Sequence, residues 1–138
     1  MKRCGARTRV DATATGEWSD VAKILVIDDE AAMRFLIRMA FEVEGHEVDE
    51  AANGRAALDL IESGWVPDLI ATDYMMPVMN GAELNSRIRR DPRTREVPVV
   101  MISASAGAEQ RSEPDLFLRK PFDPIALAGH AERLLSRE

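Results

Sequence analysis

The feature that most constrains this chain is a regular alternation of short apolar runs with longer segments of helical periodicity. Apolar runs, several of them rich in β-branched residues, cover residues 22–27, 67–72 and 97–103. Residues 46–51 alternate between polar and apolar side chains, as in a strand nearer the sheet edge, and residues 115–120 are expected to form the fifth strand. The helical patterns lie between and after them, at residues 30–45, 54–64, 81–91 and 123–138. Short β-branched runs are typical of strands buried on both faces. The alternation therefore predicts an α/β fold, in which a doubly wound five-stranded parallel sheet carries helices on both faces.

The chain is expected to hold one domain. Its 138 residues are enough for one domain with a substantial core, but not for two. Residues 1–21 lack apolar periodicity and are rich in Arg, Thr, Ala and Gly, which predicts a disordered N-terminal tail. We expect the folded domain to occupy residues 22–138.

Charge and composition exclude several classes of function. The formal net charge of -6 argues against direct nucleic-acid binding, which needs a basic surface. No apolar run approaches the length that spans a bilayer, so no membrane partner is expected. The single cysteine, Cys4, permits no internal disulfide, and a reducing cytoplasmic location is the expectation.

Polar residues stand where the predicted strands end. Asp28 and Asp29 follow the first strand, Asp73 the third, Ser103 closes the fourth, and Lys120 closes the fifth. Each residue alone has a structural explanation, such as a helix cap, a turn or a loop hydroxyl. Binding sites in parallel sheets nevertheless form outside the carboxyl ends of the strands. Three aspartates meeting there would repel one another unless a cation lay between them.

The ligand types narrow the expected cation to Mg²⁺. All-oxygen donors with room for water suit magnesium better than zinc, and neither Cys4 nor His46 belongs to the strand-end set. His46 and His130 are interpreted as solvated. The first strand-to-helix turn, DDEAAM, contains no glycine-rich phosphate cradle. A metal held by acids, with a lysine and a hydroxyl opposite, could neutralise a phosphoryl group attached to one of the carboxylates.

The strand-end residues lie in four motifs, ILVIDDE, PDLIATDYMMPVMNG, VPVVMISAS and LRKPF. In this order and spacing they make residues 22–138 resemble a response-regulator receiver domain of two-component signalling. The resemblance implies a flavodoxin-like sheet of strand order 2-1-3-4-5. It also implies a phosphoacceptor rather than an enzyme with an external substrate, with a histidine kinase or histidine phosphotransfer protein as phosphoryl donor.

The resemblance also implies a role for each acid. Asp73 would be the phosphoacceptor, attacking a phosphohistidine to form an acyl phosphate. Asp28 and Asp29 would hold Mg²⁺ together with Asp73 and the backbone carbonyl of Met75.

Further roles on the other side of the pocket are implied in the same way. Lys120 would neutralise charge on the transferred group, and Ser103 would bond one of its oxygens. Ala104 would leave space for the phosphoryl group. The Lys120-Pro121 bond matches a Lys-Pro bond that is often cis in the family, and Phe117 stands where the family places its switching aromatic.

One segment departs from the family pattern. Between Ser103 and Lys120 the chain is shorter than usual by roughly one helical turn. The small-residue pair that commonly precedes the last strand is replaced by Glu113-Pro114-Asp115. The fourth helix is therefore expected to be short or irregular, which places the usual switching mechanism and partner surface in doubt.

Three hypotheses for function remain open. The first is a stand-alone regulator that signals through a downstream protein or a phosphorelay, because the chain ends within the receiver's own last helix. The second is a receiver-shaped interaction module that acts without phosphorylation. The third is an aspartate-nucleophile phosphatase, which would normally carry a second acid where this chain has Met75.

Overall fold

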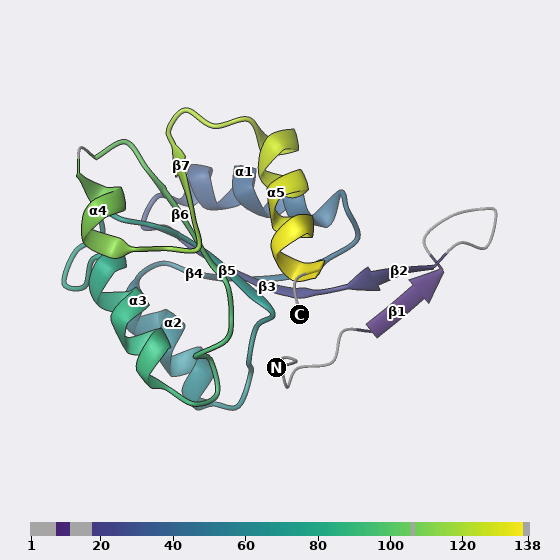
Figure 1. Ribbon diagram of the computed structural model, residues 1–138, viewed down its shortest axis with the longest axis horizontal. Coiled ribbons are helices and arrows are strands. Elements are labelled where there is room, and N and C mark those ends of the chain that lie inside the picture. The colour runs from purple at the N-terminus through teal and green to yellow at the C-terminus, as the bar shows by residue number, and fades with distance from the viewer. Residues whose placement is uncertain (1–7, 12–17, 106, 137–138) are drawn as a thin grey trace.

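A computed structural model describes residues 8–11, 18–105 and 107–136. Its centre is a five-stranded, all-parallel sheet of spatial order β4-β3-β5-β6-β7 (Figure 1). The strands are β3 (Lys23–Ile27), β4 (Glu47–Ala51), β5 (Leu69–Asp73), β6 (Val99–Ser103) and β7 (Leu116–Arg119). The predicted doubly wound sheet of order 2-1-3-4-5 is confirmed.

Helices cover both faces of this sheet. They are α1 (Ala31–Glu42), α2 (Gly54–Glu62), α3 (Gly81–Arg90), α4 (Ala108–Ser112) and α5 (Pro124–Ser136). Figure 1 shows α1 and α5 on one side of the sheet and α2 and α3 on the other, with α4 next to α3. No described helix combines the length and the apolar composition needed to cross a membrane.

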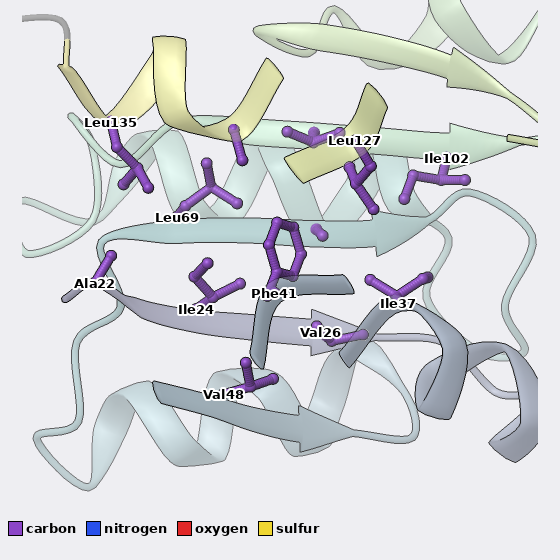
Figure 2. Close-up of a cluster of buried hydrophobic side chains, with 13 residues drawn as sticks. Ala22, Ile24, Val26, Ile37, Phe41, Val48, Leu69, Ile102, Leu127 and Leu135 are labelled. Carbon is purple, nitrogen blue, oxygen red and sulfur yellow. The ribbon is translucent and has the colours of Figure 1, made fainter. Parts of the chain in front are cut away.

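The side chains of β3 explain why two helical layers are needed. Ile24 and Val26 join one buried cluster with residues of α1 and α5, including Phe41 (Figure 2). Leu25 and Ile27 point to the opposite face and pack with α2 and α3. Successive side chains of a strand alternate between faces, so a continuous apolar run requires cover on both sides.

Part of the predicted N-terminal tail differs from the expectation. Residues Thr8–Asp11 (β1) pair in antiparallel fashion with Trp18–Val21 (β2), and β2 is separated from β3 only by Ala22. Figure 1 shows this hairpin leading away from the main sheet. Backbone pairing requires no apolar periodicity, so the sequence pattern gave no signal for it. Residues 1–7 and 12–17 of the predicted tail lie outside the described residues.

The fourth helix is short, as predicted. Helix α4 has five residues and is bounded by Gly107 and Glu113, whose φ angles are 77° and 46°. The side chain of Asn85, on α3, ties its end in place by donating from Nδ2 to the Ser112 carbonyl oxygen at 2.6 Å. Because so short a helix contributes few backbone hydrogen bonds of its own, its position depends on this tertiary contact.

His46 corrects another expectation. It is buried rather than solvated, at 6% exposure. Its Nδ1 accepts a hydrogen bond from the Ala22 backbone N–H at 3.1 Å, and its Nε2 lies 2.8 Å from Glu132 Oε2 on α5. The imidazole therefore joins the start of the central strand to the last helix.

Candidate functional site

Asp73 is the last residue of β5, and it is buried at 6% exposure. The chain turns back directly behind it, where Gly81 N–H donates to the Tyr74 carbonyl at 2.8 Å. A Cβ on Gly81 would lie 2.8 Å from the Asp73 carbonyl oxygen. Helix α3 can therefore start against the end of β5 only because its first residue has no side chain.

Asp28 and Asp29 follow β3, the strand next to β5. Asp28 is buried, and its Oδ1 accepts a hydrogen bond from the Glu30 backbone N–H at 2.9 Å. Asp29 is exposed. The acidic pair thus offers one carboxylate fixed by the loop backbone and a second one open to solvent.

The structure brings the three predicted aspartates together. Asp28, Asp29 and Asp73 each offer a carboxylate oxygen, and these oxygens lie within 4.8 Å of one another. Burial raises the pKa of Asp28 and that of Asp73, and the charge of Asp28 raises the pKa of Asp73 further. Carboxylates that are held close and buried in this way disfavour their own ionised forms.

Lys120, directly after β7, supplies a positive charge to this cluster. Its Nζ lies 3.5 Å from Asp28 Oδ2 and 3.4 Å from Asp73 Oδ1. The ammonium lowers the pKa of both carboxyls, but burial is the largest single cause and the net shift of both is upward. The Lys120-Pro121 peptide bond is cis. One cation facing three acids leaves the cluster with an excess of negative charge.

The donor set fits a hard divalent cation. Three carboxylates at one edge provide oxygen ligands only, and Asp29 faces solvent, which leaves room for water ligands. Oxygen donors and retained waters are what Mg²⁺ prefers. A bound dication would also offset the repulsion that raises the pKa of Asp73.

The remaining predicted residues differ in burial and in the groups that they contact. Ser103 ends β6 and is buried, and its Oγ accepts from the Ser105 backbone N–H at 3.0 Å. Ala104 and the side chain of Met75 are exposed. Phe117 is half-buried on β7 and packs with a cluster that includes Tyr74, so it belongs to the α4 side rather than to the pocket.

Sequence reasoning missed one residue that touches the acidic loop. Arg34, on α1, donates from Nη1 to the Asp28 backbone oxygen at 2.7 Å. Its place one turn into the helix that follows the acidic pair was the only available signal. Because the acceptor is a backbone carbonyl, the sequence does not identify the partner of Arg34.

Comparison with known proteins identifies the family. The sequence profile of the response regulator receiver domain matches residues 24–132. Over 119 residues the chain is 35% identical to the phosphate regulon transcriptional regulatory protein PhoB of Pseudomonas aeruginosa, covering 83% of this chain and 52% of that protein. Over 132 residues it is 36% identical to the alkaline phosphatase synthesis transcriptional regulatory protein SphR of Synechococcus elongatus, covering 86% of this chain and 51% of that protein. The chain thus spans about half the length of these relatives.

Solved structures support the same family assignment. The receiver domain of a signal transduction histidine kinase from Syntrophus aciditrophicus superposes with a TM-score of 0.77 at 30% identity, covering 84% of this chain and 91% of that one. The chemotaxis response regulator CheY4 of Vibrio cholerae gives 0.74 at 28% identity, covering 83% and 98%. On these matches, together with its fold, the chain belongs to the response regulator receiver domain family, a family of signalling domains.

Proposed function

We propose that this domain accepts a phosphoryl group on Asp73 from a phosphohistidine of a histidine kinase or a histidine phosphotransfer protein. The observation that carries the proposal is the convergence of Asp28, Asp29 and Asp73 within 4.8 Å, opposite the Lys120 ammonium. An excess of carboxylates over cations at a strand edge costs stability. It is most readily explained as a site for a dication and a phosphoryl group.

Asp73 acts as the nucleophile. A carboxylate oxygen attacks the phosphorus, the P–N bond of the phosphohistidine breaks, and its electron pair leaves with the imidazole. Asp28, Asp29 and Asp73 would hold Mg²⁺ with the Met75 carbonyl. When bound there, the ion supplies positive charge for the oxygens of the transferred group. The domain thereby catalyses its own modification and, with water as the nucleophile, its reversal.

Lys120 stabilises the product. In the unmodified domain its Nζ is shared between Asp28 and Asp73. Formation of the acyl phosphate removes the carboxylate charge of Asp73 and presents phosphoryl oxygens instead, to which the ammonium can turn. The Ser103 hydroxyl, at the end of the neighbouring strand, would donate to another oxygen, and the small Ala104 leaves space beside it.

The phosphorylated domain would act on a downstream protein by direct contact or by passing the phosphoryl group onward. Phe117 is proposed as the aromatic that responds, since it packs with Tyr74, the residue after the phosphoacceptor. The five-residue α4 lies against the same cluster through Ala108. A change at Asp73 can therefore reach the surface around α4 through the packed side chains of Tyr74, Phe117 and Ala108.

The test is phosphorylation with acetyl phosphate and Mg²⁺, followed by intact-protein mass spectrometry. Wild type is expected to gain one phosphoryl group, and Asp73→Asn to gain none. Asp59→Asn, an exposed acid on α2, is the matched control and should be modified like wild type. Absence of modification in wild type, or modification of Asp73→Asn to the same extent, would overturn the proposal.

The interaction module without phosphorylation has one observation in its favour, the unusually short α4. A pull-down with wild type and Asp73→Ala, each with and without acetyl phosphate, separates the two functions. Capture that depends on both acetyl phosphate and Asp73 supports phosphosignalling. Equal capture in every arm supports the module.

A further inference from the structure

Arg34 connects the acidic loop to the edge of the sheet. From the first turns of α1, its Nη1 donates to the Asp28 backbone oxygen at 2.7 Å. Its Nε donates to Glu50 Oε1, on strand β4, at 3.0 Å. The side chain is only 19% exposed. One guanidinium thus fixes the end of the central strand relative to its outer neighbour, and its planar fork of donors suits this double role.

The carbonyl that Arg34 holds belongs to the peptide unit joining Asp28 to Asp29. A peptide unit is planar, so fixing its oxygen also fixes the direction in which Asp29 leaves the loop. Asp28 has further support, because its N–H donates to the Ala51 carbonyl at 3.2 Å and its Oδ1 accepts from Glu30 N–H. Within the described part of the chain, the Asp29 carboxylate has no hydrogen bond or ion pair of its own. Its position therefore depends on the backbone that Arg34 holds.

The other end of the connection is also held. Glu50 Oε2 accepts from Arg38 Nη1 at 2.6 Å, and Arg38 Nε donates to Glu42 Oε2 at 2.7 Å. These arginine contacts lower the pKa of Glu50, with Arg38 as the largest cause, so Glu50 stays ionised as an anchor. Arg38 shares the anchor with Arg34, but only Arg34 has a hydrogen bond to Asp28.

From this geometry we propose that Arg34 is a positioning residue for Mg²⁺ binding, which orients Asp28 and Asp29 through the Asp28 carbonyl. The inference rests on the proposed function only in taking Mg²⁺ as the ion. The two possible roles of Arg34, as a charge and as a positioning group, predict opposite changes in Mg²⁺ affinity when it is removed. A cation near a dication site repels the dication, so removing Arg34 as a mere charge would tighten Mg²⁺ binding. Removing it as a positioning group weakens binding.

The experiment is equilibrium Mg²⁺ titration by calorimetry, without any phosphodonor, on wild type, Arg34→Gln and Arg38→Gln. Both variants lose one positive charge and one Glu50 contact, which makes them a matched pair. Loss of an outer hydrogen bond that orients metal ligands typically costs 10–100-fold in affinity. We expect Arg34→Gln to raise the Kd by about tenfold, and Arg38→Gln to stay within about twofold of wild type.

A second readout separates positioning from folding. In the acetyl phosphate reaction, Arg34→Gln should need more Mg²⁺ for half-maximal rate, while its rate at saturating Mg²⁺ stays near that of wild type. If Arg34→Gln does not fold, Arg34→Lys replaces it, since it keeps the positive charge but loses the planar fork that reaches both Glu50 and the Asp28 carbonyl. A several-fold weakening is then expected.

Three results would overturn the inference. They are unchanged or tighter Mg²⁺ binding by Arg34→Gln, equal weakening in Arg34→Gln and Arg38→Gln, and unchanged binding in Arg34→Lys where that variant replaces Arg34→Gln. These results are distinguishable from failure of the proposed function. Wild type that binds Mg²⁺ but is never phosphorylated would refute the phosphoacceptor role and leave the Arg34 result standing. Normal phosphorylation with unchanged Mg²⁺ binding in Arg34→Gln would refute only the positioning role.

Discussion

The two ends of the sheet use buried polar residues in opposite ways. At the amino end, Asp68 Oδ2 accepts from the Lys23 backbone N–H at 2.9 Å, and His46 bonds both Ala22 and Glu132. At the carboxyl end, Asp28 and Asp73 face each other, and burial raises the pKa of both. The first arrangement connects neighbouring elements. The second accumulates like charge.

The two arrangements should affect the stability of the fold in opposite ways. A buried polar group with complementary partners contributes modestly to folding, and it costs more when a partner is removed. A buried carboxylate beside another of its kind opposes folding while both are ionised. Substitutions at the two ends should therefore change stability in opposite directions.

The largest effect is expected at the amino end. His46→Ala opens a cavity and leaves the buried Ala22 N–H without its acceptor, so the free energy of unfolding should fall by roughly 2–4 kcal/mol. Urea denaturation followed by circular dichroism measures this loss. Glu132→Gln is the control, because it keeps an acceptor for Nε2 at a half-exposed site and should cost less than about 1 kcal/mol. A His46→Ala protein as stable as wild type would remove the structural contrast between the two ends.

The second largest effect is expected at the carboxyl end. Mg²⁺ should stabilise wild type by about 1.4 kcal/mol when its concentration is ten times the Kd, because it binds the folded state alone. Thermal unfolding with and without Mg²⁺ measures this shift. Asp28→Asn should lose most of it. Asp68→Asn, at the other end, should retain it in full even if its own midpoint is lower. Equal Mg²⁺ responses in the two variants would mean that the ion does not bind at the predicted edge.

The smallest effect is expected in the pH dependence of thermal stability. Because the folded-state pKa of Asp28 is raised above its ordinary value of 3.8, ionising this residue opposes folding. In metal-free buffer at pH 7, Asp28→Asn should therefore unfold at a slightly higher temperature than wild type. The gain should shrink as the pH falls through the folded-state pKa, and it should vanish below about 3.8, where wild type is protonated in both states. The effect stays small because Glu30 N–H and Lys120 offset part of the burial cost. A lower unfolding midpoint for Asp28→Asn than for wild type at pH 7 would contradict the claim that the ionised Asp28 carboxylate opposes folding.

Several features could be predicted from the sequence because they depend on short-range pattern. The apolar runs predicted the central strands, since a strand buried on both faces admits few polar residues, and the alternating residues 46–51 predicted a strand nearer the edge. The shared edge of parallel strand ends predicted that Asp28, Asp29, Asp73 and Lys120 would lie together, which is where the structure has them. The short segment after Ser103 predicted a shortened α4.

Other features were decided only in three dimensions. The β1–β2 pairing was not expected, because hydrogen bonds between backbones carry no side-chain signature. His46 was predicted to be solvated, and it is buried because its ring contacts Ala22, next to β3, and Glu132 on α5. The role of Arg34 depends on a hydrogen bond to a backbone carbonyl, a group that every residue possesses. The residue types in the sequence therefore could not predict this contact. The sequence determined which groups stand at the ends of the strands, because side-chain periodicity is local. The tertiary structure decided which backbone atoms those groups and their supports can reach, because that depends on how the strands and helices pack.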